Sequence, residues 1–249
     1  APTVGAATAL LLFAVVPFGR DLRVAGVRVP LLVADVNVGV VYALALSSLG
    51  VYGVVLGGWT SRSKYSLLGA IRGAAQMISY EVALGLALVP VVMLARSFSL
   101  VDVVDAQARA PFLLLQPVSF VIFFLAAAAE TKRTPFDLPE AENELGAGYH
   151  TEYSGMRFGL FFLGEYVNLV VLGSLVAVFF LGGWRGPWLP PFVWFVAKVL
   201  AVALGMIWVR GTLPRLRYDQ LMHLGWKVLI PLALVNILAT GAWLLAAGG

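Results

Sequence analysis

Residues 158–184 read FGLFFLGEYVNLVVLGSLVAVFFLGGW, and Glu165 is the one charged side chain in this run. A helix rises about 1.5 Å per residue, so about 20 residues cross a hydrocarbon core of about 30 Å. Only helices and closed barrels pair every backbone polar group inside lipid, and the strands of a barrel alternate apolar and polar residues. Because this run does not alternate, it predicts a transmembrane helix.

Apolar runs of similar length lie on both sides of this one. Together they predict an all-α fold, a polytopic transmembrane helix bundle that forms a single domain over residues 1–249. Seven spans are expected, at approximately residues 1–19, 33–59, 74–95, 110–130, 158–182, 187–209 and 227–248. The first run lacks the positive start of a signal peptide and begins with Ala1 instead of Met, so we expect a true span in a chain that starts partway along a longer protein.

The overall composition agrees with a membrane protein. Of the 249 residues, 61% are hydrophobic and 12% are charged, whereas a soluble domain carries about 25% charged residues. This excludes a soluble enzyme, a disordered protein and a nucleic-acid-binding protein with a basic face. The chain has no Cys and two His, which excludes Cys-ligated metals, and we expect no metal site.

Basic residues are divided unequally between the connecting loops. If the spans alternate, loops 60–72, 131–157 and 210–227 share one side and carry ten Lys or Arg, against six on the other side. The positive-inside rule places the ten on the cytoplasmic side. We therefore expect a multi-pass protein of a bacterial inner (plasma) membrane that begins inside and ends outside, with a mitochondrial inner membrane as the alternative.

Four carboxylates lie in or at the edges of the spans: Asp35, Glu81, Glu130 and Glu165. A charge at the bilayer centre costs about 2.5–3.5 kcal/mol on insertion scales, so such groups face the bundle interior or a wet cavity. Any one of them could be a protonated, hydrogen-bonded structural residue. Four in one small bundle favour a proton path.

The cytoplasmic loop 131–157 contains an acidic cluster, Asp137, Glu140, Glu142, Glu144 and Glu152. The three central glutamates recur at every second residue, so a helix cannot present them as one solubilising stripe. Arg133 precedes Asp137 by four residues, and arginines of loop 210–227 could also balance the cluster.

Three blocks of sequence resemble the H-type membrane subunit family of NADH-quinone oxidoreductase, respiratory complex I. The first is ETKRTPFDLPEAENEL at residues 130–145 followed by GYHTEYSG at 148–155, and the others lie at 58–81 and 210–227. The likeness covers nearly the whole chain in order. The family normally begins with another transmembrane helix and an Arg-rich amphipathic segment, which this chain does not contain, so we expect it to be incomplete. Some relatives also carry an acid in the second span, where this chain has Ser47 and Ser48.

The resemblance implies a membrane subunit that forms part of the quinone-binding chamber and the first part of an acidic proton-coupling path. By position, it implies proton coupling for Glu81, Glu130, Asp137 and Glu165. It implies a quinone cavity lined or bordered by Glu140, Glu142, Glu144, Glu152, Arg72, Arg133, Arg210, Arg215, Arg217, Tyr80 and Tyr166. Quinone would be the substrate, and this chain would bind no cofactor itself, since NADH, FMN and iron–sulfur clusters belong to partner subunits.

The expected partners are the peripheral quinone-module subunits, the neighbouring membrane subunits, quinone and the lipid bilayer, with no nucleic acid. Two alternatives stay open. One is the equivalent subunit of a membrane-bound hydrogenase or of a dehydrogenase with another electron donor. The other is a stand-alone proton-coupled carrier, which leaves the acidic cytoplasmic loop unexplained.

Overall fold

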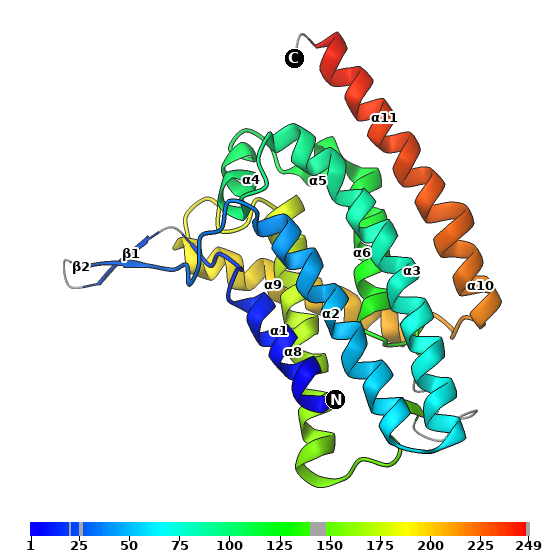
Figure 1. Ribbon diagram of the computed structural model, residues 1–249. Coiled ribbons are helices and arrows are strands. Elements are labelled where there is room, and N and C mark those ends of the chain that lie inside the picture. The colour runs from blue at the N-terminus through cyan, green and yellow to red at the C-terminus, as the bar shows by residue number, and fades with distance from the viewer. Residues whose placement is uncertain (20, 25–26, 140–147, 248–249) are drawn as a thin grey trace.

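Helices dominate the computed structural model, which describes residues 1–19, 21–24, 27–139 and 148–247. Figure 1 shows a bundle made by α1 (Pro2–Phe13), α2 (Gly39–Thr60), α3 (Lys64–Ala95), α6 (Pro117–Glu130) and α8 (Gly155–Phe180). Helix α9 (Pro191–Thr212) packs on α8. At one edge, α10 (Tyr218–His223), the π-helical turn η2 (Leu224–Leu229) and α11 (Ile230–Ala246) form one continuous helical rod.

Within the described residues, five helical segments are long and apolar enough to cross a membrane: Gly39–Thr60, Lys64–Ala95, Gly155–Phe180, Pro191–Thr212 and Tyr218–Ala246. They coincide with five of the seven predicted spans. The remaining two predictions fall on α1 and α6, apolar helices of 12 and 14 residues. These are about 18 and 21 Å long at 1.5 Å per residue, less than the hydrocarbon core of about 30 Å. The count of seven spans is therefore not confirmed.

Prolines accompany the two short helices. Helix α1 ends at Phe13, four residues before Pro17. The predicted span 110–130 is divided into α5 (Phe112–Leu115) and α6 by Gln116, which has a non-helical backbone (φ −132°, ψ 58°) and precedes Pro117. Proline has no backbone N–H to donate and disfavours a helical conformation in the residue before it, which explains the break.

A β-hairpin lies between α1 and α2, where the span prediction places only a loop. Strands β1 (Asp21–Val24) and β2 (Val27–Pro30) pair antiparallel with Asp21 opposite Pro30 and Val24 opposite Val27. The sequence here alternates charged and apolar residues, which is the period of a strand. The hairpin extends sideways from the bundle (Figure 1).

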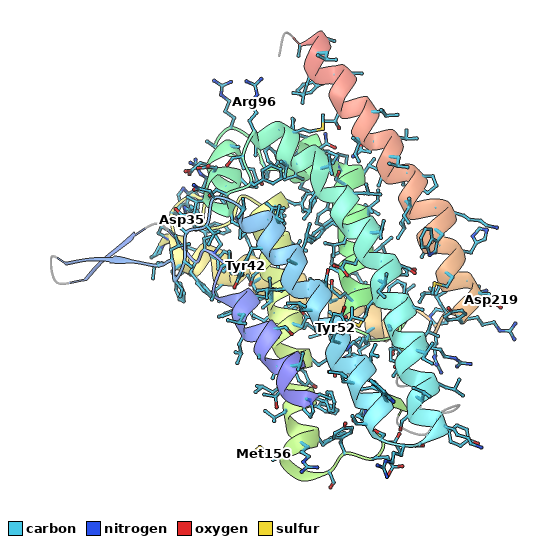
Figure 2. The ribbon with its side chains drawn as sticks, viewed as in Figure 1. Asp35, Tyr42, Tyr52, Arg96, Met156 and Asp219 are labelled. Carbon is cyan, nitrogen blue, oxygen red and sulfur yellow. The ribbon has the colours of Figure 1, made fainter. Side chains whose placement is uncertain are left out.

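The two ends of the bundle carry different connections. At one end lie the N-terminus, the α2–α3 turn and the start of α8, while α4 (Leu100–Ala106) lies at the other (Figure 1). Arg185 follows α8 and pairs with Asp105 of α4 at 2.8 Å, which places the α8–α9 connection at that second end. Arg96 and Met156 mark the opposite ends (Figure 2). This arrangement agrees with the expected grouping of loops 60–72 and 131–157 on one side.

Small residues allow close helix contacts around α1. A Cβ added at Gly53 of α2 would lie 3.1 Å from the backbone N of Gly5, and one added at Gly164 of α8 would lie 3.3 Å from the backbone N of Ala6. Inside lipid, helices associate through such van der Waals packing, because the tails solvate apolar side chains equally well. The glycines therefore let α1 fit tightly between α2 and α8, beside the candidate site.

Apolar side chains cover the outward faces of the last helices. Leu204 of α9 is 64% exposed, and Leu238 and Leu245 of α11 are 74% and 83% exposed. In contrast, Phe123 of α6 and Phe179 of α8 are fully buried against each other. Apolar residues outside as well as inside are what a bundle surrounded by lipid requires.

Candidate functional site

A small cavity lies among α1, α2, α6 and α8, with a volume of about 60 Å³. One water needs about 10–15 Å³ of such volume, so the cavity has room for several waters. It is far smaller than the roughly 300–1,000 Å³ typical of a small-molecule pocket. Most of its lining is apolar, and its polar side chains include Ser47, Glu130, Lys132, Glu165 and Asn168.

Glu130 is the last residue of α6 and is buried, with 5% of its surface exposed. Its Oε1 accepts a hydrogen bond from the Ser47 hydroxyl of α2. Its Oε2 has no hydrogen-bond partner among the described residues. Leaving such a buried atom unpaired costs about 1–3 kcal/mol, more for a charged group. Water in the cavity or a bound proton would remove this cost.

Glu81 lies on α3 and is only partly buried. It accepts a hydrogen bond from the hydroxyl of Ser48, the residue that follows Ser47 on α2. Glu130 experiences the charge of Glu81 as well as that of Lys132. Glu81 and Glu130, which lie far apart in the sequence, therefore accept hydrogen bonds from consecutive serines of α2.

Glu165 of α8 forms an ion pair with Arg133, and their side chains are 9% and 16% exposed. The Arg133 guanidinium also lies over the Tyr166 ring, 4.7 Å from its centroid. Burial lowers the pKa of Arg133, but its interactions with Tyr166 and the charge of Glu165 outweigh this, and the pKa lies above its ordinary value. Since Glu165 and Glu130 line the same cavity, Arg133 supplies a fixed positive charge beside it.

The segment 131–139 is attached to α3 through Gln76, which is fully buried. The Gln76 side-chain amide donates to the carbonyl oxygens of Ala129 at 2.8 Å and Phe136 at 2.7 Å. Tyr80, one turn further along α3, packs against the Phe136 ring and donates its hydroxyl to the Leu221 carbonyl at 3.0 Å. Tyr80 does not line the cavity, and its predicted quinone contact stays a prediction.

A second group of predicted residues lies around an open pocket at the start of α10. Arg72, Arg215 and Arg217 line it together with Leu138 and Asp219. The Nε and Nη2 atoms of Arg215 are buried and have no hydrogen-bond partner among the described residues. The structure thus separates the predicted residues into a carboxylate cavity and a basic pocket.

The other predicted residues lie elsewhere. Glu152 is exposed beside the start of α8, Arg210 is exposed in the last turn of α9, and Asp137 is partly buried in segment 131–139. Glu140, Glu142 and Glu144 lie outside the described residues.

Asp35 does not lie within a span, contrary to the prediction. It is exposed in the segment that precedes α2, far from Met156 (Figure 2). The helix begins only at Gly39, after the chain has returned from the hairpin. Asp35 does not line the cavity that Glu130 and Glu165 share.

Lys198, the one base inside a predicted span, closes the turn after α8. Its Nζ donates to the carbonyl oxygens of Leu181, Gly183 and Arg185 at 2.6, 2.9 and 2.6 Å. This contact satisfies carbonyls at a helix C-terminus, which is a structural role. No group of three or more His, Cys, Asp or Glu in the described part of the chain could hold a metal ion.

Sequence reasoning missed the polar residues that hold the carboxylates. Ser47 and Ser48 appeared only as the lack of an acid, and Gln76 and Asn168 were not singled out. The available signal was the presence of hydroxyl and amide side chains inside apolar spans, where a polar group needs a partner.

Comparison with known proteins identifies a family of similar chains. A family model described as NADH dehydrogenase matches residues 1–241. The chain is 75% identical over 248 residues to the second H-type NADH-quinone oxidoreductase subunit of Syntrophobacter fumaroxidans, an alignment that covers 100% of this chain and 75% of that protein. It is 67% identical over 245 residues to the first H-type subunit of Geobacter metallireducens, covering 98% of this chain and 74% of that protein. The H-type subunit of Syntrophotalea carbinolica is 63% identical over 248 residues, with 100% and 75% covered.

Proposed function

Because the chain belongs to the H-type subunit family of NADH-quinone oxidoreductase and is a membrane subunit of that enzyme, we propose that it carries the first part of the proton-coupling path and part of the quinone-binding chamber. The observation that supports the path is the cavity shared by Glu130 and Glu165. Both carboxylates come from apolar helices, and both have partners that hold them in place.

The proposed path runs through three carboxylates. Glu165, held by Arg133, lies on one side of the cavity, and Glu130 lies on the other with its Oε2 free to meet water or a proton. Glu81 follows on α3, close enough for its charge to act on Glu130. Because two charges interact more strongly at the low effective dielectric of a protein interior than in water, a change at one carboxylate alters proton binding at the next.

We place the quinone-binding residues of this chain at the cytoplasmic end of the bundle. The basic pocket of Arg72, Arg215 and Arg217 lies next to Leu138 of segment 131–139. The sequence continues directly into the acids Glu140, Glu142 and Glu144. We assign to these residues the border of the chamber, whose remaining walls belong to the partner subunits. Quinone reduction there would change the charge at this border and start the coupling.

The membrane arrangement is part of the same proposal. We assign seven spans in the assembled enzyme, with α1 and the α5–α6 pair completing the five longer helices, in the inner membrane of a bacterium. Electrons reach quinone from NADH through FMN and iron–sulfur clusters of partner subunits, and this chain contributes proton-binding groups. A stand-alone carrier and a subunit of a hydrogenase have no specific observation in their favour.

The test is Glu130→Gln in the assembled enzyme, which keeps the side-chain size and removes the titratable group. We expect quinone-reductase activity and proton pumping to fall together by about 10²-fold or more, the range for loss of a group that transfers protons. NADH oxidation by a hydrophilic acceptor at the peripheral subunits reports intact assembly.

Asp35→Asn is the matched control, since it removes an exposed carboxylate from the other end of the bundle and should leave both activities unchanged. Wild-type quinone reduction and pumping in Glu130→Gln would exclude Glu130 from the path.

A further inference from the structure

Ser47 and Ser48 are consecutive residues of α2 whose hydroxyls reach carboxylates on two different helices. Ser47 donates to Glu130 of α6, and Ser48 donates to Glu81 of α3. Consecutive residues of a helix with 3.6 residues per turn point about 100° apart, so one pair of neighbours can face two adjoining helices. We propose that this serine pair consists of positioning residues that hold Glu130 and Glu81 at a coupled spacing. This inference rests on the proposed proton path.

Ser48 can serve Glu81 in both of its protonation states. Its Oγ lies 3.1 Å from the carbonyl oxygen of Leu44 as well as within hydrogen-bond reach of Glu81. A hydroxyl has one donor and two acceptor lone pairs, whereas a carboxylate gains a donor only when it is protonated. When Glu81 is charged, Ser48 donates to it. When Glu81 holds a proton, it donates to the Ser48 oxygen, and Ser48 turns its own hydrogen to Leu44.

This alternation keeps the polar atoms of the pair satisfied through a protonation cycle. No covalent bond changes, and the proton stays on Glu81 while the Ser48 hydrogen reorients. An alanine at position 48 would leave the charged carboxylate without this donor. The loss would disfavour the charged state, because a hydrogen bond to an ionised group stabilises that state.

Ser47 holds the other carboxylate, Glu130, in position at the cavity. It lines the cavity beside Glu130 and occupies only one of the two carboxylate oxygens, which leaves Oε2 open. Because both serines belong to one rigid turn of α2, the same stretch of backbone holds the two carboxylates in position. The Glu81 charge that acts on Glu130 therefore acts at a fixed distance.

The charged and titratable neighbours of this pair come from several elements. Lys132 follows α6 and acts on Glu130 by its charge. Glu165 of α8, paired with Arg133, lines the same cavity. These groups are unchanged by a serine substitution, so an altered pH profile in a serine variant would come from the loss of the hydroxyl.

The test compares the double variant Ser47→Ala/Ser48→Ala with Ser47→Thr/Ser48→Thr in the assembled enzyme. We expect the alanine pair to lower quinone-coupled proton pumping about tenfold or more, because it removes two hydrogen bonds to carboxylates and each corresponds to a factor of about ten. Its pH profile and the carboxyl bands of its redox-induced infrared difference spectrum should also shift. The threonine pair retains both hydroxyls and should restore the wild-type infrared bands.

Ser174→Ala is the matched control, because Ser174 of α8 is buried and donates to the Val170 carbonyl of its own helix. It should leave pumping, pH profile and infrared bands unchanged. Wild-type pumping and carboxyl bands in the alanine pair would overturn the serine proposal, and a loss in Glu130→Gln would still support the path. Wild-type activity in Glu130→Gln as well would overturn the proposed function itself. An alanine pair that loses pumping without moving the carboxyl bands, or a threonine pair that fails to restore them, would also overturn the positioning role.

Discussion

Replacing Gln76 by leucine should loosen segment 131–139, which follows the carboxylate of Glu130. Leucine fills a similar volume on α3 but cannot donate to the carbonyls of Ala129 and Phe136, both of which lose a hydrogen bond of 2.7–2.8 Å. Each carbonyl keeps a backbone donor, from the N–H of Lys132 to Ala129 at 3.3 Å and from the N–H of Leu138 to Phe136 at 3.0 Å. The loss is therefore about 0.5–1.5 kcal/mol per hydrogen bond, or about 1–3 kcal/mol for two. The Oε1 of Gln76 is itself buried and unpaired within the described residues, and its removal offsets part of this loss.

The net cost is therefore about 0.5–2 kcal/mol for the closed state of this segment. Hydrogen–deuterium exchange of the assembled enzyme in lipid measures it directly. Amides of residues 131–139 should exchange about 2- to 30-fold faster, since 1.4 kcal/mol corresponds to a factor of ten. Quinone-reductase activity should fall as well, because Glu130 and Arg133 flank the released contact.

Gln107→Leu provides the matched control at the opposite end of the bundle. Gln107 is buried and donates to the carbonyls of Val103 and Val178 at 3.1 and 2.7 Å. Its Oε1 also accepts from the backbone N–H groups of Phe112 and Gly182 at 3.2 and 2.9 Å, so its loss is at least as severe. It should accelerate exchange near α4 and leave residues 131–139 unchanged. Unaltered exchange of 131–139 in Gln76→Leu, or equal acceleration in both variants, would refute the reasoning.

Two further predictions concern packing and charge. Arg133→Leu leaves Glu165 buried without its ion-pair partner and should destabilise the enzyme by about 3–5 kcal/mol, which a lower melting temperature would show. Adding Glu165→Leu should recover most of this loss. A double variant no more stable than the single variant would contradict the prediction. Because the pKa of Arg133 is raised, the stability from its charge is complete below its ordinary range and is lost only as pH rises through the higher value, so the effect should be the same from pH 6 to 9. Gly53→Val places side-chain atoms against the Gly5 backbone and should lower the melting temperature, with a cost of about 1–3 kcal/mol. The control is Gly159→Ala, where a Cβ meets nothing within 4 Å. An equal effect of both variants would show that α1 does not pack as described.

Local pattern was sufficient for most of the helices. Five predicted spans coincide with long apolar helices because helix formation in lipid is dictated within each segment, where every backbone group must pair with a neighbour four residues away. The two spans that came out short contain prolines, whose effect on helix length depends on the surrounding contacts. Asp35 was misplaced because a run without charges does not mark where a hairpin ends and a helix begins.

The sequence by itself determined the membrane bundle, the family and the acids Glu81, Glu130 and Glu165, because apolar length and linear motifs are properties of consecutive residues. Only the tertiary structure decided their partners. Arg133 stands four residues from Asp137 in the sequence, yet its ion pair reaches Glu165 on α8. Ser47 and Ser48 meet carboxylates 83 and 33 residues away. Such contacts depend on the rotation and depth at which helices pack, which no local pattern encodes.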